Sequence, residues 1–183
     1  GPVDLLFLNA GVGAGGPLWE NTTSDWRWAL GVNLWGVIHG ITTFLPGMVE
    51  RNSGHVVNTA SVAGLTSYPN MGIYNVTKHG VVTLSESLYH DLTLAESSVG
   101  VSVLCPGFVK TQIMSSERNR PEELRTPLIP EDEEAIAAIS EAAAAIYENA
   151  LDADVVAQQV TEAIEAGQFW ILTDDVFNDA VAL

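Results

Sequence analysis

Short apolar runs alternate with longer amphipathic stretches along this chain. The runs have the length of buried strands and end at glycine, proline or polar residues; they cover residues 3–8, 55–60, 99–105 and 169–173. The stretches between them have helical spacing and capping residues; they cover residues 24–50, 72–95 and 152–165. Strands that alternate with helices predict an α/β fold with a parallel sheet covered on both faces. We expect a single domain over residues 1–183.

The alternating pattern breaks after the third apolar run. Residues 108–130 contain three prolines and many charges, which predicts an excursion away from the sheet. Residues 131–151 are rich in alanine and have a high helix propensity. Inside the first long helical stretch, Pro46 is expected to bend or end the helix.

Composition and charge exclude several classes of protein. Apolar residues make up 47% of the chain, which is typical of a globular domain, and no apolar run is long enough to cross a membrane. We see no signal peptide, and the single cysteine fits a reducing cytoplasm. The net charge is −16, of which residues 115–183 carry −13. Binding to nucleic acids or to anionic membranes is therefore not expected, because both need clustered basic residues.

Three residues give the strongest chemical signal in the sequence. Tyr74 and Lys78 are four positions apart in a predicted helix and so share one face, while Ser61 lies 13 positions before Tyr74 in a predicted loop. A free tyrosine loses its proton at about pH 10, and a nearby cation lowers this pKa toward neutrality. A loop hydroxyl could hold a substrate oxygen in place. The trio therefore predicts proton transfer to or from an alcohol or carbonyl oxygen.

A glycine-rich segment follows the first predicted strand. Residues 11–16 match the Gly-x-Gly-x-x-Gly pattern of dinucleotide-binding loops. However, Pro17 follows at once, and no second strand ends in an acidic residue about 20 positions on, as that motif requires. We interpret the segment as a close approach of the backbone to a ligand at the end of a strand, with a pyrophosphate cradle as the alternative. No other phosphate-binding loop follows a strand in the sequence.

Five motifs, in the right order and spacing, resemble those of the short-chain dehydrogenase/reductase family over nearly the whole chain. The matching residues are Asn9-Ala10-Gly11, Asn33, Ser61, the Tyr74/Lys78 pair, and the run Pro106-Gly107-Phe108-Val109-Lys110-Thr111. Leu8 departs from the family pattern, in which a second asparagine is commonest at that place. A lone Tyr-x-x-x-Lys pair is common by chance, but the five motifs together are specific.

The resemblance implies a Rossmann-type, doubly wound parallel sheet. The first strand of this chain matches the family's fourth strand, so we expect an N-terminally truncated family member. Such a chain would lack the glycine fingerprint and the residue that separates NAD from NADP. The first strand would then expose an apolar edge.

The resemblance also assigns roles to individual residues. The catalytic residues would be Asn33, Ser61, Tyr74 and Lys78. Tyr74 would act as the general acid or base, Lys78 would lower its pKa and bind the nicotinamide ribose, and Ser61 would hold the substrate oxygen. Asn33 would hold a water molecule in a proton relay. The cofactor, NADP(H) rather than NAD(H), would contact Tyr74 and Lys78 as well as Asn9, Ala10, Gly11, Pro106, Gly107, Val109 and Thr111. No metal site is expected.

The loops around this site suggest an apolar substrate. Candidate contacts, besides Ser61 and Tyr74, are Leu65, Tyr68, Met71, Ile73 and Met114. Residues 108–150 would form a lid over a small apolar alcohol or ketone. The family's helices at 24–50 and 72–95 form oligomer interfaces, which implies a cytoplasmic homo-oligomer. The alternative is a non-catalytic fragment that keeps the catalytic side chains but binds no dinucleotide. A hydrolase is a remote third possibility, because the sequence has no Gly-x-Ser-x-Gly motif.

Overall fold

The computed structural model describes residues 1–125, 148 and 150–173, and its centre is a parallel sheet. The four strands are β1 (Leu5–Leu8), β2 (His55–Thr59), β3 (Gly100–Cys105) and β4 (Trp170–Leu172). They lie side by side in the order of the sequence, and every neighbouring pair is parallel. The four apolar runs are therefore confirmed as strands, each one or two residues shorter than predicted.

Helices occupy the connections between the strands, as expected for a parallel sheet. The longer helical elements are α1 (Thr23–Leu30), the π-helical turn η1 (Gly31–Trp35), α2 (Gly36–Arg51), α3 (Gly72–Leu94) and α5 (Ala153–Glu165). Three short 3₁₀ turns are η2 (Val62–Gly64), η3 (Ile113–Asn119) and η4 (Glu122–Leu124). Pro46 lies inside α2, which continues to Arg51, so this proline does not end the helix.

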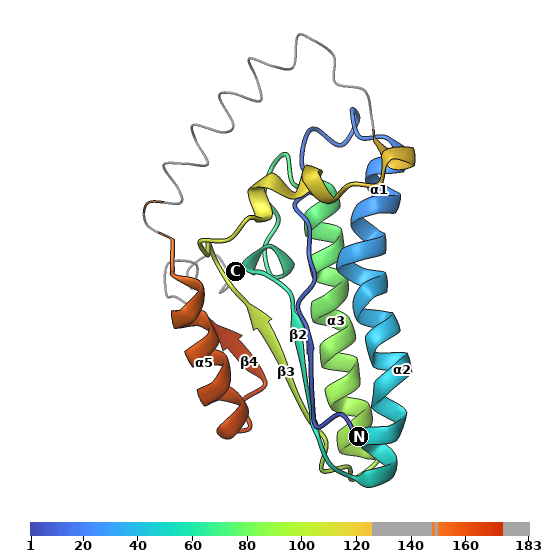
Figure 1. Cartoon of the computed structure of the whole chain (residues 1–183), viewed down its shortest axis with the longest axis vertical. Helices are drawn as coiled ribbons and strands as arrows, with labels where there is room; N and C mark the ends of the chain where they lie inside the picture. The colour runs from blue at the N-terminus through green and yellow to red at the C-terminus, as the bar shows by residue number, and fades with distance from the viewer. Residues whose placement is uncertain (126–147, 149, 174–183) are drawn as a thin grey trace.

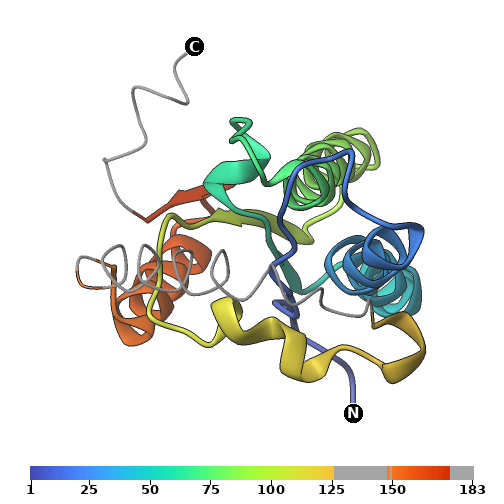
Figure 2. The same ribbon diagram turned by 90° about the horizontal axis from the view of Figure 1, so that it is seen from above.

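The sheet has helices on both faces, as Figure 1 and Figure 2 show: α2 and α3 on one and α5 on the other. Alternation along the strands decides which side chains meet which helix. On the first face, Val56 and Val101 pack with Leu88 of α3. On the second face, Val57 and Leu104 belong to a cluster with residues of α5. This layered arrangement is the α/β fold predicted from the sequence.

Strand β1 lies at one edge of the described sheet. Leu6 points toward α2 and α3 and is buried, whereas Leu5 and Phe7 on the opposite face remain 51% and 44% exposed. An exposed apolar edge was expected for this strand, and the structure has one. The interpretation of the first run as a fully buried strand is therefore wrong for one of its two faces.

Two further expectations concern the helical and lid segments. By length and composition alone, the stretch Thr23–Arg51 could cross a membrane, but core helices of soluble proteins pass the same test. Here α2 packs on the sheet with Met48 completely buried. The alanine-rich helix predicted for residues 131–151 and much of the expected lid fall outside the described residues. The described part of the lid, residues 108–125, leaves the sheet as predicted and is called the lid segment below.

Candidate active site

The loops that follow β1, β2 and β3 meet at the carboxyl edge of the sheet. The hydroxyl of Thr59 donates to the side-chain oxygen of Asn9 at 3.0 Å, which joins the end of β2 to the loop after β1. The backbone N–H of Val62 donates to the carbonyl of Pro106 at 3.0 Å, which joins the second loop to the third. Ligands of open α/β sheets bind at this edge. Three of the five sequence motifs are therefore brought together where a ligand is expected.

Ser61 starts the 3₁₀ turn that follows β2. Its Oγ accepts a hydrogen bond from the backbone N–H of Ala63 at 3.2 Å and donates to the carbonyl of Pro106 at 3.4 Å. The turn presses closely on α3, because a Cβ on Gly64 would lie only 2.7 Å from the carbonyl oxygen of Lys78. Glycine at position 64 thus lets the serine loop pack against the helix that carries Lys78.

Tyr74 and Lys78 both lie in α3, four residues apart, and both are buried. The Nζ of Lys78 lies 5.5 Å from the centre of the Tyr74 ring and donates to the carbonyl of Thr59 at 2.9 Å. Lys78 is only 2% exposed and Tyr74 is 8% exposed. The helix therefore aims the ammonium at the end of β2, alongside the phenol, as the spacing predicted.

Burial changes the acid–base properties of Lys78. Removal from water lowers the pKa of its ammonium from 10.5 to about 8, although the nearby Cys105 acts in the opposite direction. Within the described chain, its Nζ has a single hydrogen-bond acceptor, the Thr59 carbonyl. An ammonium has three donors, so two remain for a ligand. The backbone of Gly11 passes close to this ammonium, since a Cβ at that position would lie 3.6 Å from Nζ, in ordinary van der Waals contact. The predicted contact of Lys78 with a nicotinamide ribose stays a prediction.

Asn33 occupies the π-helical turn η1 and is completely buried. Its Oδ1 accepts from the backbone N–H of Val12 at 2.8 Å, and its Nδ2 donates to the carbonyl of Val12 at 3.0 Å and to the hydroxyl of Thr77 at 3.1 Å. Thr77 in turn donates to the carbonyl of Tyr74 at 2.8 Å. The amide thus fixes the loop after β1 to α3. The water relay proposed for Asn33 stays a prediction.

Thr77 was missed by the sequence reasoning, although a signal existed. It lies three residues after Tyr74 in a helix, so both residues belong to one face. A buried hydroxyl on this face must find a partner, and Asn33 supplies it. Ser116 was also missed. Its Oγ accepts from the backbone N–H of Gly13 at 2.9 Å, and no local pattern marks a serine for a partner 103 positions away.

The glycine-rich segment 11–16 packs between two other loops of the protein. A Cβ on Gly13 would lie 3.2 Å from the carbonyl oxygen of Ile113 in the lid segment. A Cβ on Gly15 would lie 3.1 Å from the carbonyl oxygen of Asn70, which also accepts from the N–H of Gly16 at 2.8 Å. The predicted close backbone approach is present, but at Gly13, Gly15 and Gly16 it is an approach to protein.

The remaining cofactor candidates lie just before the lid segment and at its start. The bridge between Val109 and Leu151 uses the carbonyl of Phe108 and the N–H of Lys110, so the N–H and C=O of Val109 itself point away from Leu151. That orientation suits the predicted backbone contact of Val109 with a nicotinamide. The N–H of Gly107 donates to Thr173 at 3.3 Å.

The substrate candidates occupy different environments. Leu65 packs partly into the core, and Ile73 is almost fully buried. Tyr68 and Met71 lie half-buried in the loop before α3, and Met114 is exposed in η3. Their contact with a substrate stays a prediction.

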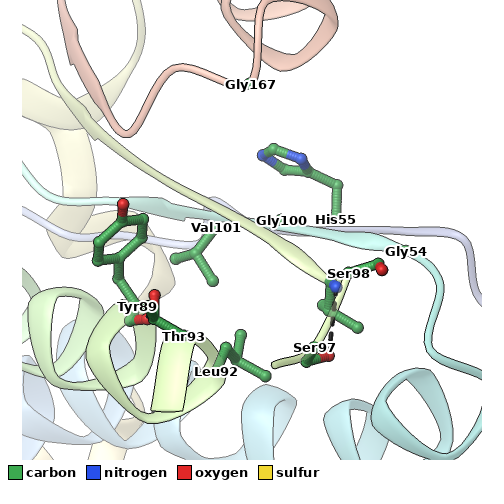
Figure 3. A pocket seen from close by; sticks show the side chains of 11 residues that line it. Gly54, His55, Tyr89, Leu92, Thr93, Ser97, Ser98, Gly100, Val101 and Gly167 are labelled. Atoms are coloured by element: carbon green, nitrogen blue, oxygen red, sulfur yellow. Dashed lines mark hydrogen bonds between the residues drawn. The ribbon is translucent and has the colours of Figure 1, made fainter. Parts of the chain in front are cut away.

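A separate hollow of about 330 Å³ lies near the amino ends of β2 and β3 (Figure 3), and its lining includes His55, Tyr89 and Leu92. The Nε2 of His55 lies 2.8 Å from the Oγ of Ser102, which itself donates to the carbonyl of Gln168 at 2.6 Å. His55 must therefore donate to Ser102, because the serine proton is already used. This hollow contains none of the predicted site residues.

Comparisons with known proteins agree with this geometry. The family model of the short chain dehydrogenases matches residues 1–122. The chain is 32% identical over 183 residues to a CLA biosynthesis dehydrogenase/reductase of Lactiplantibacillus plantarum, covering 99% of this chain and 64% of that relative.

Solved structures give the same result. A short chain dehydrogenase/reductase from Burkholderia phymatum in complex with NAD is 50% identical, with a TM-score of 0.92 over 100% of this chain and 65% of its own. A putative short-chain dehydrogenase from Novosphingobium aromaticivorans is 37% identical, with a TM-score of 0.75 over 100% of this chain and 56% of its own. The chain thus spans somewhat less than two thirds of the length of these proteins. It belongs to the short-chain dehydrogenase family.

Proposed function

We propose that this chain carries the catalytic residues of an NAD(P)-dependent oxidoreductase that interconverts an alcohol and a ketone or aldehyde. The observation that carries this proposal is the buried ammonium of Lys78, which lies beside Tyr74 and, among the described residues, donates to one acceptor, the Thr59 carbonyl. Lys78 has no carboxylate partner among the described residues, and burying such an ammonium is costly for a fold, so a functional reason for it is expected.

Each catalytic side chain has a role that follows from its position. Tyr74 donates a proton to the carbonyl oxygen during reduction and removes the hydroxyl proton during oxidation. Lys78 stabilises the phenolate of Tyr74 electrostatically and hydrogen-bonds the ribose. Ser61 turns its hydroxyl from the Pro106 carbonyl toward the substrate oxygen and stabilises the charge that develops there. The dinucleotide, when bound, supplies or accepts the hydride.

The cofactor proposal is a nicotinamide dinucleotide bound along the carboxyl edge of the sheet. Asn9, Ala10 and Gly11 would border its adenosine side. The lid segment would border its nicotinamide, through Val109 and Thr111. The similar structure from Burkholderia phymatum holds NAD, whereas the sequence led us to expect NADP(H). Nothing in the described residues decides between the two, so both nucleotides belong in the test.

A small apolar alcohol or ketone is the proposed substrate class. The residues proposed to contact the substrate besides Ser61 and Tyr74 are mostly apolar, and one of them, Met114, is exposed on the lid segment. The strong negative charge of residues 115–183 disfavours a highly anionic substrate.

Self-association through the outer faces of α1–α2 and α3 is part of the proposal. Several large apolar side chains are exposed on these helices: Trp35, Phe44, Val49 and Val76. Exposed apolar groups of this size mark interaction surfaces when they gather on one face. We expect such an oligomer to occur in the cytoplasm.

A fluorescence titration with NADH and NADPH tests the proposal. We expect saturable binding of at least one nucleotide, weakened by Lys78→Met and unchanged by Lys110→Met. Lys110 is the only other lysine of the chain and pairs with Asp152 at the surface, which makes it a matched control. Absence of binding at millimolar nucleotide would instead support the alternative, a non-catalytic fragment that keeps the catalytic side chains.

A further inference from the structure

Arg120 is a buried cation in the most acidic part of the chain. It directly follows η3 and is only 7% exposed. Its Nη2 lies 2.5 Å from the Oδ1 of Asp25, its Nη1 lies 3.1 Å from the Oε1 of Glu117, and its guanidinium carbon lies 4.9 Å from the centre of the Trp28 ring. Asp25 and Trp28 belong to α1, about one hundred positions earlier in the sequence. The guanidinium therefore joins the lid segment to the first helix of the chain.

The carboxylate of Asp25, which pairs with Arg120, is held in place by a residue of its own helix. Thr22 is the N-cap of α1, and Asp25 completes a capping box with it. The Oδ2 of Asp25 accepts from the N–H of Thr22 at 2.6 Å and from its hydroxyl at 2.7 Å, so Oδ1 faces Arg120. Burial raises the pKa of Asp25, but the hydrogen bonds from Thr22 and Arg120 outweigh it and hold this pKa below 3.8. The pair is therefore ionic at neutral pH.

The middle of η3 contacts the loop after β1. Ser116 donates to the carbonyl of Ile113 and accepts from the N–H of Gly13 at 2.9 Å. The neighbouring Val12 is held on both backbone groups by Asn33. Figure 1 and Figure 2 show the segment running from the end of β3 across to the start of α1. One short turn is thus tied to the active-site loop through Ser116 and to α1 through Arg120.

We propose that the Arg120–Asp25 pair is a latch that docks residues 113–120 against the active-site edge, with Arg120 as a positioning residue. Separating the pair would leave a guanidinium or a carboxylate without its buried partner, so partly undocked positions are disfavoured. Docking keeps Ser116 in contact with Gly13 and keeps the apolar lid residues next to the substrate. The part of the inference that concerns turnover rests on the proposed function; the docking itself does not.

Hydrogen exchange tests the docking without any need for activity. The reporter is the amide of Gly13, which donates to Ser116. We expect Arg120→Gln and Asp25→Asn each to speed its exchange at least about tenfold, because local opening then becomes more frequent. Asp25→Asn keeps a side-chain oxygen that can accept the capping hydrogen bonds of α1. If Arg120→Gln does not fold, Asp25→Asn alone tests the docking.

Two further variants make the exchange experiment specific. Arg118→Gln is the matched control, since Arg118 bonds only to nearby groups of Gln112 and Ser115 among the described residues. It should leave the exchange rate of the Gly13 amide unchanged. Arg120→Lys keeps the charge, so exchange of the Gly13 amide should be slower in this variant than in Arg120→Gln. Unchanged exchange in Asp25→Asn, or an equal effect of Arg118→Gln, overturns the latch.

Kinetics test the consequence for the site. Arg120→Gln should raise the KM for substrate at least about tenfold while changing kcat less, because it removes binding rather than chemistry. The double variant with Asp25→Asn should be no worse than the single one, because both break the same contact. If the Gly13 amide responds as expected but the protein turns over no alcohol or ketone, the latch stands and the proposed function fails. If the protein turns over substrate but Arg120→Gln changes neither KM nor the exchange of the Gly13 amide, the latch is wrong and the proposed function stands.

Discussion

The charge state of Lys78 offers a quantitative prediction about the stability of this protein. Burial lowers the pKa of its ammonium from 10.5 to about 8. At about 1.36 kcal/mol per pKa unit, this difference corresponds to roughly 3 kcal/mol. The unfolded chain binds the proton more tightly than the folded one between these two pH values. Stability should therefore rise with pH through this window, and the full penalty should be present below about pH 8.

Lys78→Met isolates this contribution because methionine keeps an unbranched apolar stem and has no charge. We expect wild type to gain stability relative to this variant from pH 7 to pH 9. The difference at pH 7 alone is less informative, because the variant also leaves the Thr59 carbonyl unpaired, which costs about 1–3 kcal/mol. Burial raises the pKa of Cys105 to about 12, so this thiol makes the folded protein less stable as the pH rises above 9. The comparison of wild type with Lys78→Met therefore ends at pH 9.

Urea denaturation followed by tryptophan fluorescence at three pH values provides the measurement. Lys110→Met is the control, because it removes a half-exposed lysine beside Asp152 and keeps Lys78, so its stability should rise with pH as that of wild type does. Carbon-13 labelling of the lysine ε-carbons adds a direct titration, because the chain has only two lysines. Parallel pH dependence of wild type and Lys78→Met, or a Lys78 resonance that titrates near 10.5, would refute the reasoning.

Three more predictions follow from single contacts. Gly64→Ala should destabilise the protein by about 1–3 kcal/mol in urea denaturation, because its Cβ would meet the backbone of α3. Gly31→Ala has open space around its Cβ and should be neutral or stabilising, so equal effects of the two variants would contradict this prediction. Asn33→Ala should cost at least about 2 kcal/mol, because it orphans both backbone groups of a buried residue in the loop after β1; a loss below about 0.5 kcal/mol would argue against that role. Burial lowers the pKa of His55 from 6.5, so wild type should lose stability as pH falls below 6.5, and His55→Gln should remove this dependence; an unchanged pH profile would exclude it.

The sheet and its helices could be predicted because each apolar run had one simple explanation. A run such as 99–105 is too short for a helix and too apolar for a loop. Pro106 and Gly107, which follow it, end the strand. Ser61, Tyr74 and Lys78 could likewise be placed, because helical spacing joins two of them and a loop after β2 carries the third. These predictions depend on short-range patterns, which a single sequence contains.

The contacts that could not be predicted join residues far apart in the sequence. Nothing local marks Arg120 as the partner of Asp25, and an arginine in an acidic segment is usually solvated. Gly13 and Gly15 matched a ligand-binding pattern, yet they are glycines because carbonyl groups of Ile113 and Asn70 lie close to them. The π-helical turn around Asn33 also has no sequence signature.

Turnover by Tyr74→Phe tests the central claim most directly. The assay follows nicotinamide absorbance with wild type, Tyr74→Phe and the surface control Tyr89→Phe over a panel of apolar alcohols and ketones. Loss of a general acid or base is expected to lower the rate about 10²–10⁴-fold in Tyr74→Phe while nucleotide binding persists, and Tyr89→Phe should match wild type. A Tyr74→Phe protein that turns over substrate at the wild-type rate would contradict the assignment of proton transfer to this phenol.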